Sequence, residues 1–271
     1  MIVFPNAKIN LGLNIIEKRT DSFHNIETVF LPIKLCDALE IVAVEQNTSF
    51  ESSGVNIPPD NSDNLCLNAY KLLKNQYNLP NVKIHLHKAI PVGAGLGGGS
   101  SDAAFTIRLL NDLFALNLGV NKMKEYAANL GSDCSFFIEN KASVATGRGE
   151  ILEDVDLELN GKFIVVVKPE IHISTAMAYS LINPVMPEKS IKSIIKQPID
   201  TWKEELKNDF ESPLMSKYSI IQDIKSELYK DGAVYASMSG SGSSVFGIYN
   251  EKPTVRLKTL FPSCFYWSGL I

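Results

Sequence analysis

The segment IPVGAGLGGGSSDAAFTIRLLNDLF, residues 90–114, limits the possible folds of this chain more than any other. Five of the seven residues from 93 to 99 are glycine, and glycine permits left-handed backbone and the close approach of other groups. Behind them, Ala103, Ile107 and Leu110 share one stripe at helical spacing. An ordinary turn needs far fewer glycines. The segment therefore predicts a specialised loop that leads into a helix.

The composition is that of a globular protein with one large domain or two modest ones. The 271 residues are 45% hydrophobic and 21% charged, which is enough to bury a core. The net charge of −4 offers no basic surface for a nucleic acid. No apolar run approaches the roughly 18 residues of a membrane-spanning helix, and the N-terminus lacks a signal-peptide pattern. We expect neither nucleic acid nor membrane as a partner.

The cysteines indicate the compartment. Four are scattered along the chain without a C-x-x-C pair, so disulfides and a structural zinc site are not expected and a reducing environment is favoured. We therefore expect a cytoplasmic protein. Its sequence leaves open whether it is a monomer or a homodimer.

Strand and helix patterns alternate along the first half. The alternation of apolar residues and the turn residues predict strands at 8–16, two strands within 28–44 around a turn at Asp37, a turn at 60–63 that caps a helix at 65–77, and a strand at 82–88. In the last of these strands Val82, Ile84 and Leu86 share one face. After the glycine segment and its helix, we expect another helix with Asn121 as N-cap and Gly131 as C′ residue.

The second half predicts a split βαβ unit, as in ferredoxin-like folds. Its pattern gives a strand at 162–168, a helix at 219–230, strands at 233–238 and 245–249, a helix at 254–260 and a strand at 264–269. The fold class is therefore α+β, with one domain at 1–155 and a second at 156–271.

The glycine segment has two functional interpretations. Gly93, Gly95 and Gly98 spell G-x-G-x-x-G, the dinucleotide fingerprint. That fingerprint requires a buried parallel strand before the loop and an acidic residue at the end of the next strand. Here the preceding strand alternates, Pro91 separates it from the loop, and a second helix follows the first. The alternative is a phosphate cradle, in which loop N–H groups and the N-terminus of a helix hold an anion.

Three sequence motifs together resemble the GHMP kinase superfamily. PVGAGLGGGSSDAA is similar to its glycine-rich phosphate loop, FPNAKINLGLNI to its N-terminal motif, and MSGSGSSVFGIY to its C-terminal glycine motif. DSFHNIETVF, LGSDCSFF and GRGE resemble one branch, whose substrate is a methylerythritol with a cytidine diphosphate head. The resemblance covers most of the chain and is weakest at about 185–230.

The resemblance implies a two-domain fold with the active site between the halves. The N-terminal half would be ribosomal-protein-S5-domain-2-like and the C-terminal half ferredoxin-like. It implies that Lys8 and Asp133 meet at the substrate hydroxyl, with Asp133 as general base. A carboxylate can accept the hydroxyl proton, while an ammonium stabilises the developing oxyanion. Taken alone, Lys8 reads as a solvated strand lysine and Asp133 as a capping residue.

The implied cofactors are ATP and Mg²⁺. ATP would contact the loop and its surroundings, at Asn64, Leu65, Lys88, Pro91, Val92, Gly93, Ala94, Gly95, Leu96, Gly97, Gly98, Gly99, Ser100 and Ser101. The small-molecule substrate with its cytidine diphosphate head would contact Asn10, Phe23, His24, Thr175, Tyr179, Gly240 and Ser241. The Mg²⁺ ligands are unknown from sequence, with Ser101 and Asp133 as candidates.

The chain departs from the family pattern at three positions. Ser22 and Phe23 stand where glycine and tyrosine are usual, and a phenyl ring stacks without a hydroxyl. Ser135 replaces a proline, which predicts a slightly looser Asp133 turn. Three alternatives remain open from sequence: a homoserine- or mevalonate-type kinase, a dinucleotide-dependent oxidoreductase, and a non-catalytic nucleotide-binding protein.

Overall fold

The computed structural model describes residues 1–57 and 64–271, which form two compact units. The first unit contains Met1–Ala7, Leu35–Val92 and Gly97–Lys141, and the second contains Lys8–Lys34, Gly93–Leu96 and Ala142–Ile271. The chain therefore passes between the units at the start of its second strand and inside the glycine loop. Each unit is built from several segments of the sequence. The predicted domains 1–155 and 156–271 therefore stay a prediction.

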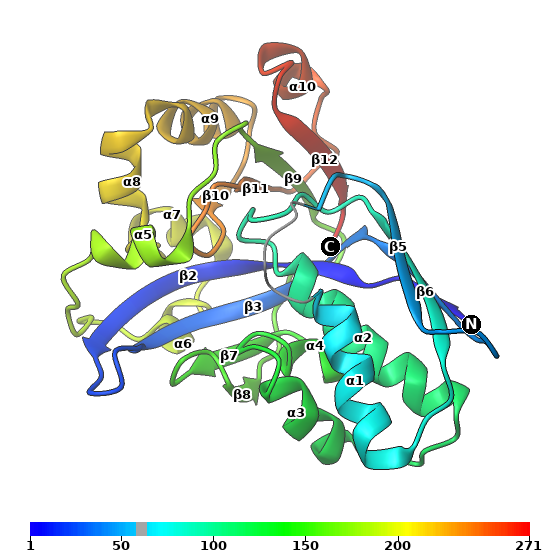
Figure 1. The fold of residues 1–271 in the computed structure, drawn as a ribbon. Coiled ribbons are helices and arrows are strands. Elements are labelled where there is room, and N and C mark those ends of the chain that lie inside the picture. Colours follow the sequence, from blue (N-terminus) through cyan, green and yellow to red (C-terminus); the bar gives the residue numbers. More distant parts are fainter. Residues whose placement is uncertain (58–63) are drawn as a thin grey trace. The chain divides into compact units, whose positions relative to one another are not determined.

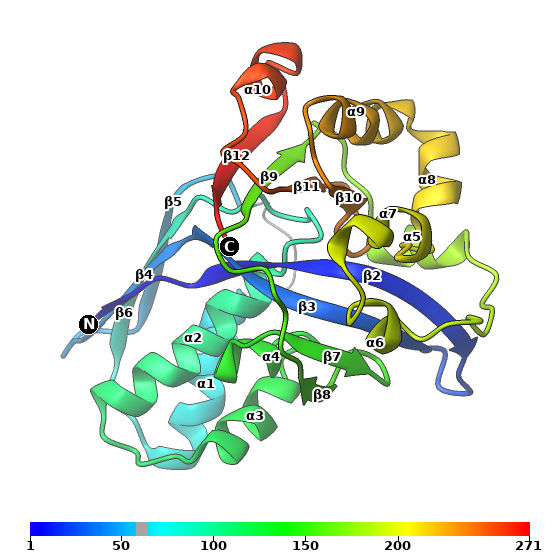
Figure 2. The same cartoon turned by 180° about the vertical axis from the view of Figure 1, so that it is seen from behind.

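The first unit is a sheet with helices packed on it. The sheet has the order β1-β4-β6-β5. Its strands are β1 (Ile2–Val3), β4 (Ala38–Ala43), β5 (Ser49–Gly54) and β6 (Val82–Lys88), and its helices are α1 (Leu65–Tyr77), α2 (Gly98–Leu113), α3 (Val120–Ala128) and α4 (Phe136–Glu139). Helices α1 and α2 lie side by side in both views (Figures 1 and 2). Val82, Ile84 and Leu86 of β6 are buried, which confirms the predicted alternation.

Local hydrogen bonds explain where the helices begin. The Asn64 side chain accepts a hydrogen bond from the Cys66 N–H at 2.9 Å and caps α1, whereas the predicted turn at 60–63 lies outside the described residues. The predicted ends of α3 are wrong. Gly119 is its N-cap, since the Gly119 carbonyl already accepts from the Met123 N–H at 3.1 Å, and Asn129 closes it in place of Gly131.

The second unit contains two sheets. The first has the order β2-β3-β7-β8 and the second the order β10-β11-β9-β12. Their strands are β2 (Asn6–Lys18), β3 (His24–Cys36), β7 (Ser143–Thr146), β8 (Ile151–Asp154), β9 (Phe163–Lys168), β10 (Tyr235–Met238), β11 (Val245–Tyr249) and β12 (Phe265–Leu270). The helices are α5 (Thr175–Ser180), α6 (Ile191–Ile194), a 3₁₀ turn at Ile199–Thr201, α7 (Trp202–Glu205), α8 (Glu211–Lys217), α9 (Ser219–Lys230) and α10 (Arg256–Leu260).

The predicted split βαβ unit is confirmed in the second sheet. Strands β9 to β12 pair antiparallel in the order that ferredoxin-like folds have, with β9 between β11 and β12. Val166 of β9 faces Phe246 on one side and Trp267 on the other. Helix α9 packs on β10 and β11 (Figure 1), where Ile221, Ile224 and Leu228 of α9 are buried at helical spacing.

Strand β2 is buried over most of its length, including the polar residues in its first half. Lys8 and Asn10 lie among apolar neighbours and are 4% and 1% exposed. Buried polar side chains need hydrogen-bond partners, and the Lys8 ammonium donates to the Asn10 side-chain oxygen. Among the described residues, none of the helices is both long and apolar enough to cross a bilayer.

Candidate active site

The front of the glycine loop is packed against the turn between β10 and β11. The Ser239 hydroxyl donates to the Gly95 carbonyl at 2.8 Å, and the Ser244 N–H donates to the Ala94 carbonyl at 3.2 Å. Gly95 has a φ of +75°, and a Cβ there would lie 2.0 Å from the Ser239 carbonyl oxygen. Only glycine fits at this position. The Lys8 N–H donates to the Leu96 carbonyl at 2.9 Å, which joins the loop to β2.

The back of the loop begins helix α2. Gly97 has a φ of +69° and is the N-cap, and no side chain caps this end. The first N–H groups of a helix have no partner within it, and they attract anions. Ser101 is fully buried, yet its hydroxyl has no hydrogen-bond partner among the described residues. A helix N-terminus without a side-chain cap, beside a buried hydroxyl that has no partner among the described residues, is suited to phosphate oxygens.

A buried ion cluster lies under the loop. The Lys88 ammonium pairs with the carboxylate of Asp37 and, at 2.7 Å, with that of Asp102. The second Asp37 oxygen accepts from the N–H groups of Ala89 and Ile90 at 2.6 and 2.8 Å. This carboxylate therefore fixes the chain where it leaves β6 and approaches the loop.

Asp102 is the least satisfied member of this cluster. It is 3% exposed, and its Oδ1 has no hydrogen-bond partner among the described residues. Burial raises the pKa of Asp102 to about 7, even though the Lys88 ammonium lowers it, and the neighbouring Asp37 raises it further. The cluster holds two carboxylates and one ammonium, so keeping a proton on Asp102 limits the buried charge.

Several of the predicted ATP contacts meet in the first unit. A Cβ at Gly98 would lie 3.3 Å from the Lys88 ammonium, and one at Gly99 would lie 3.6 Å from the Leu65 side chain. Asn64 stands one residue before Leu65, with its side-chain oxygen occupied as a helix cap. Val92 is 40% exposed beside the loop.

Asp133 lies in the turn between α3 and α4 of the first unit. Its neighbour Cys134 is buried. Burial raises the pKa of the Cys134 thiol to about 12, even though the Ser100 side chain acts to lower it, so this thiol packs and is no nucleophile. Asp133 is therefore next to a buried residue whose thiol is influenced by Ser100 of α2.

Ser135 holds the Asp133 turn in place. It is 5% exposed, and its hydroxyl donates to the Lys124 carbonyl of α3 at 3.0 Å. A proline has no such hydroxyl. The looser turn expected at this position is therefore not supported, because a hydrogen bond ties the turn to the preceding helix.

Lys8 is a buried, positioned side chain. Its ammonium donates to the Asn10 side-chain oxygen at 2.6 Å and lies 4.6 Å from the centre of the Phe30 ring. The Asn10 amide donates to the Thr28 hydroxyl at 3.0 Å. The solvated strand lysine considered from sequence is excluded by this burial. Lys8 and Asp133 belong to different units, so their meeting stays a prediction.

The predicted aromatic contacts gather at another part of the second unit. The rings of His24 and Tyr179 stack with centroids 4.7 Å apart, and Phe210 meets Tyr179 edge-on at 5.0 Å. Phe23 is 51% exposed and carries the Arg148 guanidinium over one face at 4.9 Å. Ser22, where the family has glycine, adopts the left-handed φ of 68° that favours glycine.

The remaining predicted substrate residues lie near the C-terminal glycine motif. The Thr175 and Ser241 hydroxyls are 3.4 Å apart. A Cβ at Gly240 would lie 3.2 Å from the Asn10 side-chain oxygen. Within the second unit, the structure thus joins the Asn10 strand to the Gly240 turn, and the Ser241 side chain to the first residue of α5.

Four buried polar residues of the two units carry no functional prediction from the sequence. Asp37 is predicted only as a turn residue, and Asp102 has no prediction of its own. Asn208 and Glu211, which contact the β10–β11 turn, fall where the resemblance is weakest. The one available signal was Lys88, a charged residue between a strand and the loop, which needs a counter-charge if it is buried.

The fold and the glycine loop define a GHMP kinase, and family comparisons agree. The family model of the GHMP kinases N-terminal domain matches residues 64–141, and that of the GHMP kinases C-terminal domain matches residues 190–258. A solved mevalonate kinase from Methanococcus jannaschii has the same fold, with a TM-score of 0.74, at 16% identity and over 100% of this chain and 98% of its own.

Closer relatives define the branch. A 4-diphosphocytidyl-2-C-methyl-D-erythritol kinase of Parabacteroides distasonis is 49% identical over 99% of both chains, and one of Cytophaga hutchinsonii is 53% identical over 93% of this chain and 94% of its own. A crystal structure of 4-(cytidine 5'-diphospho)-2C-methyl-D-erythritol kinase has a TM-score of 0.84, is 29% identical, and covers 99% of this chain and 98% of its own. The chain belongs to the 4-diphosphocytidyl-2-C-methyl-D-erythritol kinase family.

Membership in this family makes the chain an ATP-dependent phosphotransferase that acts on a small molecule. The dinucleotide-dependent oxidoreductase is thereby excluded. The structure also argues against a dinucleotide-binding fold, because α2 is followed by the helices α3 and α4 and not directly by a strand with an acidic end.

The Asp102 pKa gives a test of the ion cluster. Its folded-state pKa of about 7 lies above the ordinary 3.8, so its contribution to stability is full below pH 3.8 and is lost as pH rises through about 7. Asp102→Asn removes this dependence. We expect the variant to gain stability relative to the wild type between about pH 4 and pH 7.5, measured by urea unfolding.

Asp112→Asn is the matched control, because Asp112 is exposed on the same helix. Its difference from the wild type should stay constant over that range. An Asp102→Asn difference that is equally flat, or that falls as pH rises, contradicts a raised pKa in the cluster.

Proposed function

We propose that this protein transfers the γ-phosphate of ATP to the 2-hydroxyl of 4-diphosphocytidyl-2-C-methyl-D-erythritol, in the non-mevalonate route to isoprenoid precursors. The observation that carries the proposal is the similarity to kinases named for this substrate, at 49% identity over 99% of both chains. The sequence motifs support it, because Lys8 and Asp133 lie in segments that resemble those of this family.

The glycine loop is the proposed binding site of the ATP phosphates. The N–H groups of Gly98, Gly99 and Ser100 begin α2 without a side-chain cap, and the Ser101 hydroxyl behind them is buried and unpartnered among the described residues. Phosphoryl transfer depends mainly on positioning and on charge stabilisation. Backbone donors fixed by a folded loop supply both without reorganising.

Mg²⁺ fits this site as an ion held mainly by the nucleotide. The described residues contain no cluster of three or more metal-ligating His, Cys, Asp or Glu side chains, and Mg²⁺ in kinases uses few protein ligands besides phosphate oxygens. Ser101 and Asp133 are the residues that would hold it. When bound, the ion neutralises charge on the phosphate oxygens.

We propose Asp133 as the general base and Lys8 as its partner. Lys8 is held by Asn10 in a buried strand, which fixes the direction of its ammonium. The ammonium would stabilise the Asp133 carboxylate and the oxygen that attacks phosphorus, while the carboxylate accepts the hydroxyl proton. The effect of the Ser100 side chain on the pKa of the neighbouring Cys134 thiol supports this role, because Ser100 belongs to the start of α2.

The cytidine head would bind at the aromatic cluster of Phe23, His24 and Tyr179. An exposed Phe23 ring and a Tyr179 ring braced by Phe210 supply flat faces for a base. His24 supplies ring nitrogens for its polar edge. Because His24 covers one face of Tyr179 at 4.7 Å, stacking of the base on that face requires the imidazole to turn aside.

A homoserine- or mevalonate-type activity has weaker support. A solved homoserine kinase of Cytophaga hutchinsonii is 13% identical with a TM-score of 0.67, and such identities show the fold alone. Neither homoserine nor mevalonate has a base that would use the aromatic cluster. The cluster therefore favours the cytidine substrate within this superfamily.

The role of Asp133 is tested by Asp133→Asn. We expect turnover at saturating substrates to fall by at least about 10²-fold, the usual scale of positioned proton transfer, while the KM for ATP changes little. Glu125→Gln is the control, since the Glu125 side chain is a carboxylate of α3 that is 64% exposed. Turnover near that of the wild type in both variants would remove Asp133 from the mechanism.

The role of Tyr179 is tested by Tyr179→Leu. Loss of base stacking is worth about 1–3 kcal/mol, so the KM for the cytidine substrate should rise roughly 5- to 150-fold with turnover retained. The control is Tyr218→Leu, because Tyr218 packs partly buried against the same core. Equal increases in KM in the two variants would show that packing, and not stacking, is lost.

A further inference from the structure

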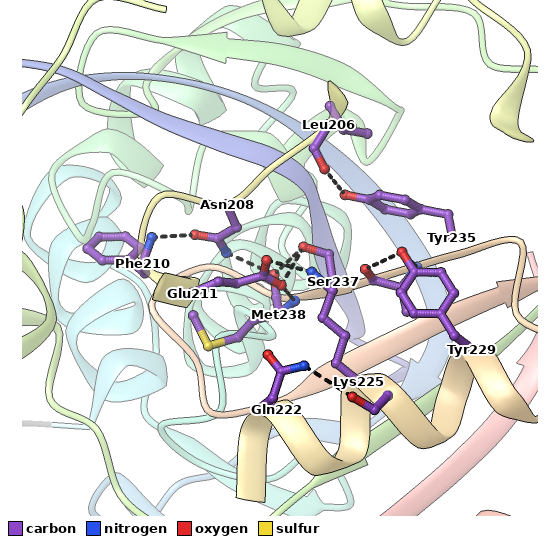
Figure 3. Close-up of polar contacts among 12 residues, drawn as sticks. Leu206, Asn208, Phe210, Glu211, Gln222, Lys225, Tyr229, Tyr235, Ser237 and Met238 are labelled. Carbon is purple, nitrogen blue, oxygen red and sulfur yellow. Dashed lines mark hydrogen bonds and ion pairs between the residues drawn. The ribbon is translucent and has the colours of Figure 1, made fainter. Parts of the chain in front are cut away.

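A buried polar cluster lies behind the C-terminal glycine motif, where no part of the proposed reaction uses it. Asn208 and Glu211 precede and begin helix α8, and they are 3% and 8% exposed. Figure 3 shows both side chains directed at the end of β10. Burying a carboxylate and an amide costs free energy unless their polar atoms have hydrogen-bond partners. The partners of these two side chains therefore show what they hold in place.

Asn208 holds two carbonyls of one turn. Its side-chain amide donates to the carbonyls of Met238 and Gly240 at 2.8 and 2.9 Å, and its oxygen accepts from the Phe210 N–H at 3.0 Å. An amide nitrogen has two hydrogens to donate, and both are used on a single turn. The side chain therefore sets the distance between the two carbonyls.

Glu211 holds the strand end that enters this turn. One of its oxygens accepts from the Met238 N–H at 2.7 Å and from the Ser237 hydroxyl at 3.1 Å. The other pairs with the Lys225 ammonium of α9 at 2.7 Å. Lys225 balances the buried charge, and the first oxygen is left to fix the backbone.

Ser239 lies between Met238 and Gly240 and contacts the glycine loop. Its hydroxyl donates to the Gly95 carbonyl at 2.8 Å and accepts from the Asn10 N–H at 3.3 Å. The residues beside Asn208 also bind β2 directly, since the Leu13 N–H donates to the Lys207 carbonyl at 2.8 Å and the Asp209 N–H to the Leu13 carbonyl at 2.9 Å. All these residues lie in one compact unit.

We propose that Asn208 and Glu211 are positioning residues. They hold the turn from Met238 to Gly240 so that Ser239 fixes the front of the glycine loop against the strand of Asn10. Their effect on catalysis rests on the proposed function of that loop. Their effect on the loop itself does not, because it follows from the hydrogen bonds alone.

The test is Asn208→Asp, which keeps the shape and the oxygen that accepts from Phe210. It replaces the amide hydrogens with an oxygen that faces two carbonyls. We expect loop exchange, meaning hydrogen exchange at the Asn10 and Ser244 N–H groups that donate to Ser239 and to Ala94, to speed up at least about 10-fold. We expect kcat/KM for ATP to fall about 10- to 100-fold. Exchange needs no substrate, so a wild type that fails to phosphorylate the cytidine substrate would end the proposed function without deciding this test.

Tyr229→Phe is the matched control. The Tyr229 hydroxyl donates to the Ala236 carbonyl at 3.2 Å and accepts from the Ala236 N–H at 3.1 Å, on the same strand but away from the turn. It should lower thermal stability while leaving loop exchange and kcat/KM for ATP unchanged. The same loss in both variants means general destabilisation and overturns the proposal.

A double substitution tests the route through Ser239. In a Ser239→Ala background, Asn208→Asp should add little further loop exchange, because the contact it supports is already gone. An equal added effect in both backgrounds overturns the proposed route. If Asn208→Asp does not fold, Glu211→Gln undergoes the same measurements, with the same expected direction and the same contrary result.

Discussion

The close packing of Gly95 against the Ser239 carbonyl is the constraint on which the site depends. A Cβ at Gly95 would lie 2.0 Å from that oxygen, so any other residue at position 95 would force the loop and the turn apart. The contact fixes the front of the glycine loop to the ferredoxin-like sheet, while the back of the loop begins α2. The loop therefore needs glycine both for its left-handed φ and for this approach.

Two buried carboxylates, one in each unit, follow one physical rule. Asp37 pairs with Lys88 and accepts from two backbone N–H groups, and Glu211 pairs with Lys225 and accepts from Met238. In each pair the ammonium offsets the cost of burial and the carboxylate fixes a segment of backbone. Both segments touch the glycine loop or the turn packed on it. The buried carboxylates therefore fix the positions of these two backbone segments.

The sequence predicted the parts of the fold that local patterns specify. The alternation in β6, the apolar stripe on α2 and the succession of strands and helices from β9 to β12 along the chain each follow from hydrophobic periods within a few residues. The Lys88 contact with Asp37 spans 51 positions and that of Asn208 with Gly240 spans 32, and single polar residues carry no period. The start of α3 differs from the prediction because the Gly119 carbonyl already accepts the first helical hydrogen bond, two residues before Asn121.

The central claim is that backbone N–H groups of the loop hold the phosphates of ATP. Glycine-selective ¹⁵N labelling tests it directly, since the chain has only 17 glycines and their backbone resonances are few. The account predicts that ATP with Mg²⁺ shifts the resonances of Gly93, Gly95, Gly97, Gly98 and Gly99, while CDP alone leaves them in place. Loop resonances that do not respond to ATP, or that respond equally to NAD, would contradict it.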